Sequence, residues 1–320
     1  MDTQAFSRSK YKDGERLGDD VFLNIPGAVT GVFDGASDPM GTIIDGEPAG
    51  RFAARIVAQT TAGSMLDPDA RRWSVERILG TLSDGLAGGI GSQNLPVRPS
   101  TTLALVLDNG PEFRLLIMGD TGVRVNGGAV HKFSKSIDNV STCARVAVFN
   151  LLAARHPETD AAEKLTRRVI FRGLEAAVKE GVLTHAEVGE IITSTVDETA
   201  LQPRAAAIQE FLMAGIRVQH QYANDPAHPF GFSSMDGHMP LLDDVIDFTL
   251  PKEGLQSLEL FTDGYYTTPQ GTDVAAWEQE HARIESLDFH KLNEFASVKG
   301  STQGEYWDDR TVVIMRSVKD

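Results

Sequence analysis

The sequence feature that most constrains the fold is an apolar run that ends abruptly in an aspartate followed by a glycine. It occurs first at residues 28–35, AVTGVFDG, and again near the C-terminus at residues 258–264, LELFTDG. A short apolar run bounded by turn residues is typical of a buried strand, and a glycine at its end permits a close approach of another backbone. Each run is therefore predicted to bring a carboxylate, Asp34 or Asp263, to the edge of a sheet.

Three other acidic positions lie beside predicted strands. Asp120 follows the apolar run 113–118, and Asp308-Asp309 stand directly before the apolar run 311–315. Asp19-Asp20 precede the run 21–25, which the turn NIPG joins to the next strand as a hairpin. Strand ends that offer several carboxylates predict one oxygen-rich metal site, assembled from distant parts of the chain.

The residue types at these strand ends indicate a hard cation. Carboxylate oxygens suit Mg²⁺ or Mn²⁺, whereas zinc sites draw on cysteine and histidine, which the pattern lacks. Two such ions about 4 Å apart, with a water between them, suit in-line attack on phosphorus without a protein nucleophile. No nucleophile motif of the types GxSxG, HExxH or P-loop is present.

Composition excludes several other classes of protein. The 320 residues carry a formal net charge of −15, which argues against nonspecific binding to nucleic acid or to an acidic membrane. No apolar window long enough to span a membrane and no signal-peptide core are found, so a cytoplasmic location is expected. The single cysteine, Cys143, excludes an intrachain disulfide framework and is expected to be a buried thiol in a helix.

Between the strands, apolar spacing predicts helices at residues 47–65 and 74–86, and the glycine-rich residues 85–91 are interpreted as a connector. From residue 141 to residue 215 the pattern is helical throughout, with predicted helices at 143–155, 158–179, from 184 onward and 203–215. The chain is therefore expected to form a single domain, residues 1–320, with a helical insertion at about 141–215. Substrate selection, a lid and dimerisation all remain open as roles of the insertion.

Four motifs in a fixed order carry a family resemblance. FDG at 33–35, GDT at 119–121, TDG at 262–264 and DDRTVVIM at 308–315 resemble those of the metal-dependent PPM (PP2C-type) serine/threonine phosphatases. The resemblance implies an α+β fold, a four-layer αββα sandwich of two antiparallel sheets flanked by helices. It also implies two Mn²⁺ or Mg²⁺ ions per site, with a third, weaker one in some members.

The resemblance assigns roles to the acidic residues. Asp34 resembles the carboxylate that bridges the two metals, and Gly35 the residue that offers its carbonyl oxygen. Asp263 and Asp308 resemble the other ligands of the first metal. Asp120 resembles the carboxylate associated with the third metal.

Two N-terminal assignments follow from the same resemblance. Asp19 or Asp20 resembles the acidic residue that serves the second metal, and the choice between them stays open. Arg16 falls close to the position of a phosphate-binding arginine. By these assignments the catalytic residues would be Asp34, Asp263, Asp308 and Arg16.

One departure from the family pattern affects the expected activity. Where members often continue the first motif with a histidine or methionine and glycines, this chain has Ala36-Ser37-Asp38, so the histidine proposed as a general acid in some members is absent. The leading hypothesis is a phosphatase of phosphoserine or phosphothreonine in a protein partner. The alternatives are a catalytically weak regulatory or binding module of the same fold, and a phosphatase of a small phosphorylated metabolite. The oligomeric state is left open.

Overall fold

The computed structural model describes residues 1–317, and their contacts divide them into two compact units. The first unit consists of Met1–Ser134, Phe232–Arg283 and the chain from Asp308 onward, and the second of Lys135–Gly231 and Ile284–Trp307. The predicted helical insertion at about residues 141–215 falls in the second unit. The assignment of the whole chain to a single domain stays a prediction.

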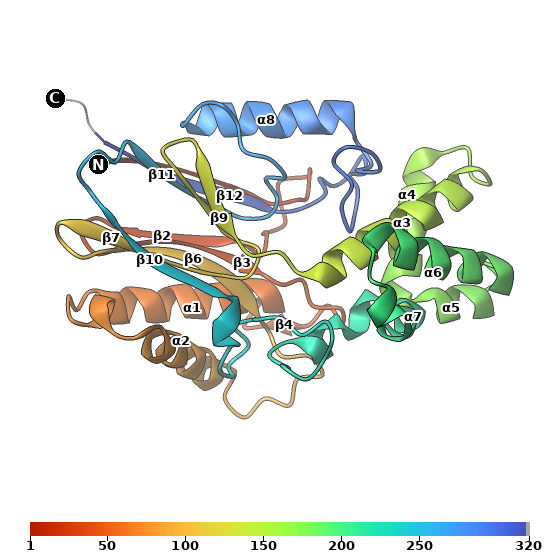
Figure 1. Cartoon of the computed structure of the whole chain (residues 1–320), viewed down its shortest axis with the longest axis horizontal. Coiled ribbons are helices and arrows are strands. Elements are labelled where there is room, and N and C mark those ends of the chain that lie inside the picture. The colour runs from red at the N-terminus through yellow and green to blue at the C-terminus, as the bar shows by residue number, and fades with distance from the viewer. Residues whose placement is uncertain (318–320) are drawn as a thin grey trace. The chain divides into compact units, whose positions relative to one another are not determined.

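The first unit contains two five-stranded sheets in which every strand pair is antiparallel (Figure 1). The first sheet has the order β1 (Asp2–Arg8), β12 (Arg310–Arg316), β11 (Ser257–Phe261), β8 (Gly122–Val125) and β9 (Ala129–Lys132). The second has the order β10 (Val245–Pro251), β7 (Glu112–Met118), β6 (Thr101–Asp108), β3 (Val29–Gly35) and β2 (Val21–Ile25). A small third sheet pairs β4 (Ile43–Ile44) with β5 (Glu47–Pro48).

The alternation of side chains along the strands explains why the two sheets pack face to face. Successive residues of a strand point to opposite faces, and in β6 Ala104 and Val106 belong to the core between the sheets, together with Val123, Leu260 and Val313 from the other sheet. The intervening leucines of β6 belong to a separate core on the outer face: Leu103, Leu105 and Leu107. Both faces of this sheet are therefore covered by apolar side chains.

Helices cover the outer face of each sheet. Helices α1 (Ala49–Met65) and α2 (Val75–Ile90) supply Phe52, Leu79 and other buried residues to the core that holds the β6 leucines. Helix α8 (Val274–Leu287), whose residues up to Arg283 belong to the first unit, packs Trp277 against Phe261 and Val312 of the other sheet (Figure 1). The predicted αββα sandwich of two antiparallel sheets is confirmed.

Two predicted turns fix the strand register. The N–H of Ala28 donates to the carbonyl oxygen of Ile25, and Gly27 between them adopts a φ of +76°, a left-handed value that glycine tolerates. The resulting β2–β3 hairpin places Asp20 just before one strand and Asp34 at the end of the next. The turn at residues 108–110 joins β6 to β7 in the same way.

The interpretation of residues 85–91 as a connector is wrong, because they continue α2 to Ile90 and only Gly91 ends the helix. A Cβ at Gly85 would lie 2.3 Å from Oγ1 of Thr60, and one at Gly89 would lie 3.2 Å from Ile56. These glycines allow α1 and α2 to pack closely. They therefore reflect helix packing and not a break in the helix.

The second unit is helical. Its helices are α3 (Ser136–Ala153), α4 (Thr159–Arg172), α5 (Leu174–Lys179), α6 (His185–Thr199) and α7 (Ala205–Ala214). The predicted single helix at 158–179 is wrong, because Gly173 adopts a φ of +91° and separates α4 from α5. The predicted capping box of Thr184 and Glu187 at the start of α6 is confirmed.

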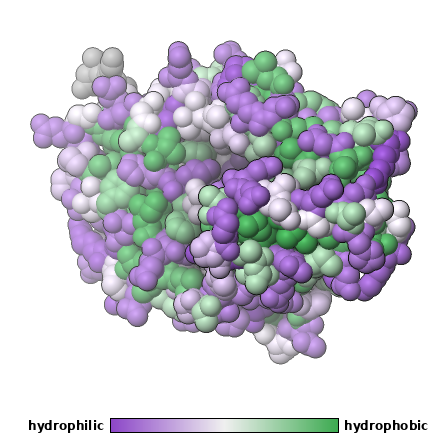
Figure 2. All heavy atoms as spheres, turned by 45° about the vertical axis from the view of Figure 1, so that its right-hand side comes forward, coloured by the Kyte–Doolittle hydropathy of each residue, from purple (hydrophilic) through white to green (hydrophobic). Residues whose placement is uncertain are grey.

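Short 3₁₀ segments complete the secondary structure: η1 (Ala70–Arg72), η2 (Gln202–Arg204), η3 (Ile216–Tyr222) and η4 (Leu242–Asp244). Cys143 lies in α3 as expected, but its side chain is only half-buried. Within residues 1–317, no helix combines the length and the apolar character that a membrane span requires. Figure 2 shows hydrophilic and hydrophobic side chains interspersed over the face that it displays.

Candidate metal centre

All the acidic residues predicted to form the site lie in the first unit, at or next to strand ends. Asp34 is the penultimate residue of β3, and Asp263 follows β11 by two residues. Asp308 precedes β12 by two residues, and Asp120 follows β7 by two. Since β3 contacts both β11 and β12 across the sandwich, the topology brings these ends toward one another.

The charges of four of these carboxylates act on the pKa of Asp34. Burial raises the pKa of Asp34, and the negative charges of Asp263, Asp20, Asp120 and Asp308 raise it further. Like charges disfavour one another's ionised form only at short range. The predicted residues from five separate chain segments therefore form one acidic cluster.

Asp20 has an incomplete set of hydrogen-bond partners. Its side chain is buried, and its Oδ2 accepts a hydrogen bond of 2.7 Å from the hydroxyl of Thr262, but its Oδ1 is buried without a partner. Burial, followed by the charges of Asp309 and Asp308, raises the pKa of Asp20. A buried carboxylate oxygen without a donor is costly unless a cation compensates it.

The backbone around Asp20 and Asp34 is held by close contacts with α1. The guanidinium of Arg51 donates from Nη1 to the carbonyl oxygens of Gly18, at 2.9 Å, and Asp20, at 3.0 Å. A Cβ at Gly35 would lie 2.4 Å from the carbonyl oxygen of Gly50 and 2.8 Å from that of Asp19. Glycine at position 35 therefore lets the end of β3, the start of α1 and the loop before β2 meet.

Lys10, which the sequence analysis did not consider, lies beside the acidic residues. Its Nζ is 3.4 Å from Oδ2 of Asp309 and 3.7 Å from Oδ2 of Asp19, and it donates to the hydroxyl of Ser37 at 3.0 Å. Burial acts to lower the pKa of Lys10, but Asp308, Asp309 and Asp19 outweigh it, so the pKa lies above its ordinary value. The lysine is therefore protonated.

Arg16 lies at the surface, beside Asp13 and Tyr11. Its side chain is 56% exposed, forms an ion pair of 2.9 Å with Asp13, and stacks with its guanidinium carbon 3.6 Å from the ring centre of Tyr11. In this structure Lys10, not Arg16, has a side-chain nitrogen within 4 Å of Asp19 and Asp309. A phosphate-binding role of Arg16 stays a prediction.

Sequence reasoning gave no role to Lys10, Ser37 or Thr262, and it named Asp309 only as the neighbour of Asp308. Asp309 and Thr262 are neighbours in sequence of predicted ligands, which is a usable signal. Lys10 and Asp309 are separated by 299 positions, and no motif links them. Only the pairing of β1 with β12 places the end of β1 beside Asp309.

The donor set suits a hard divalent cation, because it consists of carboxylates and contains a buried oxygen without a partner. Among residues 1–317, no group of three or more histidine, cysteine, aspartate or glutamate side chains is arranged to hold a metal ion. Binding of an ion would therefore require the carboxylates to turn toward it.

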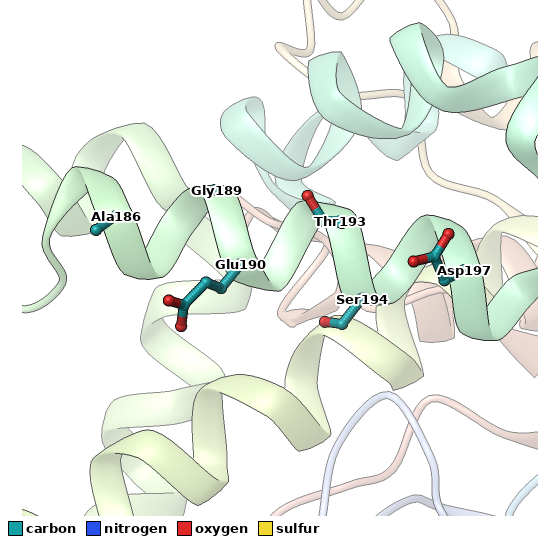
Figure 3. A pocket seen from close by; sticks show the side chains of 6 residues that line it. All are labelled: Ala186, Gly189, Glu190, Thr193, Ser194 and Asp197. Atoms are coloured by element: carbon teal, nitrogen blue, oxygen red, sulfur yellow. The ribbon is translucent and has the colours of Figure 1, made fainter.

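A hollow of about 470 Å³ lies on the second unit and is unrelated to the acidic cluster. Its lining comes from one face of α6 (Figure 3): Ala186, Gly189, Glu190, Thr193, Ser194 and Asp197. None of these residues was predicted to belong to the site. The hollow is open and lined by a single helix, so it does not enclose a ligand.

Comparison with known proteins gives matches in structure only. No model of a known protein family and no curated protein matches the chain. The solved structures that it resembles include a bacterial serine phosphatase, at 11% identity and a TM-score of 0.49, with 100% of this chain and 99% of that chain covered. They also include the serine/threonine phosphatase Stp1 from Staphylococcus aureus, at 12% identity and a TM-score of 0.47, with 99% and 95% covered.

A third similar structure is the catalytic domain of the serine/threonine protein phosphatase PstP in complex with two manganese ions, at 14% identity and a TM-score of 0.44, with 99% of each chain covered. These structures are those of serine/threonine phosphatases, the family that the sequence motifs resemble.

Proposed function

We propose that the protein is a metal-dependent phosphomonoester hydrolase that acts on phosphoserine or phosphothreonine in a protein partner. The observation that carries the proposal is the buried Oδ1 of Asp20, which has no hydrogen-bond partner and lies within a cluster of carboxylates. Burying this much negative charge costs free energy that a bound divalent cation would offset. Structural stability alone gives no reason to assemble such a cluster.

In this proposal the carboxylates of Asp34, Asp263 and Asp308, with the carbonyl oxygen of Gly35, hold Mn²⁺ or Mg²⁺. Asp20 would serve the second ion, and Asp120 a third. When bound, such ions lower the pKa of a coordinated water and offset charge on the phosphoryl oxygens. No side-chain nucleophile is needed.

The surrounding residues keep the ligands in place. The Thr262 hydroxyl fixes one oxygen of Asp20 and leaves the other available. Arg51 ties the loop that carries Asp20 to α1, and Gly35 permits the close approach of that loop. Ligands held by their neighbours lose little conformational freedom when an ion binds.

The test is hydrolysis of a phosphoserine peptide and of a generic aryl phosphate at increasing Mn²⁺ concentration. Wild type is expected to show metal-dependent turnover that falls at least about a hundredfold in Asp263→Asn, because loss of a ligand charge weakens a metal contribution of several kcal/mol. Asp84→Asn, an exposed aspartate of α2, is the matched control and should retain wild-type turnover. Chelation should abolish turnover of wild type.

Two other results would replace the proposal. A folded wild type that binds Mn²⁺ but hydrolyses neither substrate would indicate a binding or regulatory module of the same fold. Turnover of small phosphorylated metabolites without turnover of phosphopeptides would keep the hydrolase and change its substrate class.

A further inference from the structure

Three large apolar side chains close to the proposed metal centre are exposed. Met40 is 65% exposed, Ile43 62% and Leu17 58%. Leu17 stands three residues before Asp20, and Met40 and Ile43 belong to the segment that follows Asp34. Single exposed apolar side chains are normal on a protein surface, whereas a group of them marks an interaction site. Their meaning therefore depends on whether the three lie in one region.

Arg51 of α1 links the segment of Ile43 to that of Leu17. Its Nη1 donates to the carbonyl oxygen of Gly18 at 2.9 Å, and its Nε lies 3.7 Å from Oε2 of Glu47. Gly18 is the residue after Leu17, and Glu47 belongs to β5, the strand that pairs with the β4 strand of Ile43. One guanidinium thus joins the backbone beside Leu17 to the hairpin that carries Ile43.

The turn that carries Met40 is joined to the same region. Oδ1 of Asp38 accepts the backbone N–H of Met40 at 3.0 Å and fixes this turn. The preceding residue, Ser37, donates from its hydroxyl to Oδ2 of Asp19 at 3.0 Å. Asp19 stands two residues after Leu17. The two segments that carry the three exposed side chains are therefore tied to each other, and we call Leu17, Met40 and Ile43 the apolar rim.

The apolar rim borders the carboxylates that the proposed function uses. The buried side chain of Asp20 belongs to the same loop as Leu17, and Asp34 lies at the end of the strand that leads to Met40 and Ile43. Successive residues of an extended peptide are about 3.3–3.6 Å apart. A phosphorylated side chain that reaches a buried centre therefore brings its neighbours in sequence against the surface around that centre.

We infer that the apolar rim binds apolar side chains that flank the phosphorylated residue of the substrate protein. Burial of apolar surface on both partners favours such a segment over one with polar flanks. The inference rests on the proposed function, because it narrows the substrate class of the same centre. Continuity with that centre favours a substrate segment as the occupant, and a second copy of the chain is the alternative that the test separates from it.

The test compares two phosphoserine peptides of the same length and charge, one with leucine and one with glutamine at the two positions on each side of the phosphoserine. Wild type is expected to hydrolyse the leucine peptide with a kcat/KM at least about tenfold higher. In the triple variant Leu17→Ser/Met40→Ser/Ile43→Ser, the preference should fall below about threefold. Equal kcat/KM values of wild type for the two peptides would overturn the inference without any variant.

Leu66→Ser is the matched control. Leu66 is also 58% exposed, but it follows the opposite end of α1 from Gly50, whose backbone lies against Gly35. This variant should keep the wild-type preference. A preference that persists in the folded triple variant, or that Leu66→Ser lowers equally, would overturn the inference.

The remaining outcomes separate the inference from the proposed function. A wild-type dimer that the triple variant converts to a monomer in sedimentation, with no preference between the peptides, would assign the apolar rim to a second copy of the chain and overturn the inference. Hydrolysis of an aryl phosphate but of neither peptide would keep the hydrolase and overturn the inference. Wild type that hydrolyses neither the peptides nor an aryl phosphate in Mn²⁺ would overturn the proposed function itself, and the inference with it.

Discussion

At the scale of single residues, Asp20 and Asp309 are both buried carboxylates, but they differ in how many donors surround them. Asp309 accepts hydrogen bonds from two backbone N–H groups and from Lys10. Asp20 accepts one from Thr262 and keeps an oxygen without a partner. Because a buried charge is tolerated only when it is compensated, the two residues suit different roles: Asp309 holds the structure together, and Asp20 is a residue that we propose to bind a cation.

Asp288 shows how backbone hydrogen bonds can satisfy a buried aspartate in the second unit. Its carboxylate accepts the backbone N–H groups of Leu292, Asn293 and Phe295 at 2.8–3.2 Å. Burial acts to raise the pKa of Asp288, but these hydrogen bonds outweigh it, so the pKa lies below its ordinary value. The carboxylate form therefore stabilises the folded state.

Asp288→Asn is expected to lower the free energy of unfolding by about 1.5–3 kcal/mol at pH 7, as for hydrogen bonds to a charged group. Because the folded-state pKa is depressed, the contribution is complete above the ordinary aspartate pKa of about 4 and is lost as the pH falls below it. Urea unfolding of both proteins from pH 7 to pH 3 should show the difference shrinking below about pH 4. Glu294→Gln, an exposed neighbour, is the control, and a difference that grows with acidity would contradict the account.

At the scale of secondary-structure elements, a buried ion pair joins two strands of the first sheet to α8. Arg124 of β8 donates from Nε to Glu259 of β11 at 2.9 Å, and Glu259 also accepts from Nε1 of Trp277 at 3.0 Å. Arg124 and Glu259 are 1% and 0% exposed. Removing one partner of such a pair leaves an uncompensated buried charge.

Arg124→Met is accordingly expected to lower the free energy of unfolding by about 3–5 kcal/mol. The double variant Arg124→Met/Glu259→Gln should be more stable than the single one, because the amide oxygen of glutamine can still accept from Trp277 without carrying a charge. Thermal and denaturant unfolding of the three proteins measures both effects. If the double variant is no more stable than Arg124→Met, the loss of stability comes from lost packing of the arginine and not from the unpaired charge of Glu259.

The contact between the end of β3 and the start of α1 makes a second prediction at this scale. Gly35→Ala would place a Cβ 2.4 Å from the backbone of Gly50, which forces a backbone shift that costs about 1–3 kcal/mol or more. Gly63→Ala, in α1 with nothing within 4 Å of the added Cβ, should instead be neutral or stabilising by about 0.5–1 kcal/mol. Equal effects of the two substitutions on the unfolding temperature would contradict this reading.

The strands and most helices could be predicted because their signals are local. Turn residues such as Gly27 and the caps at Ser74 and Thr184 act within a few positions of themselves. The glycines at 85 and 89 misled the prediction because their reason is the neighbouring helix α1, which no local pattern reveals. Gly173 likewise breaks a helix where the apolar spacing continues.

At the scale of the whole molecule, all the acidic residues of the proposed centre belong to the first unit, so the proposed chemistry draws its ligands from one compact body. The acidic residues themselves could be predicted, because each stands beside a recognisable strand. The contact of Lys10 with Asp309 could not, since it joins residues from the two ends of the chain through the pairing of β1 with β12. Contacts of this kind depend on the tertiary fold.

The central claim is that Asp34, Asp263 and Asp308 hold a divalent cation. Its most direct test is a crystal structure of the protein grown with Mn²⁺, with anomalous diffraction data collected at an X-ray energy where manganese scatters anomalously. We expect at least one strong anomalous peak about 2 Å from carboxylate oxygens of Asp34 and of Asp263 or Asp308, and its loss in Asp34→Asn. A folded wild type that shows no peak at these carboxylates in millimolar Mn²⁺ would contradict the account.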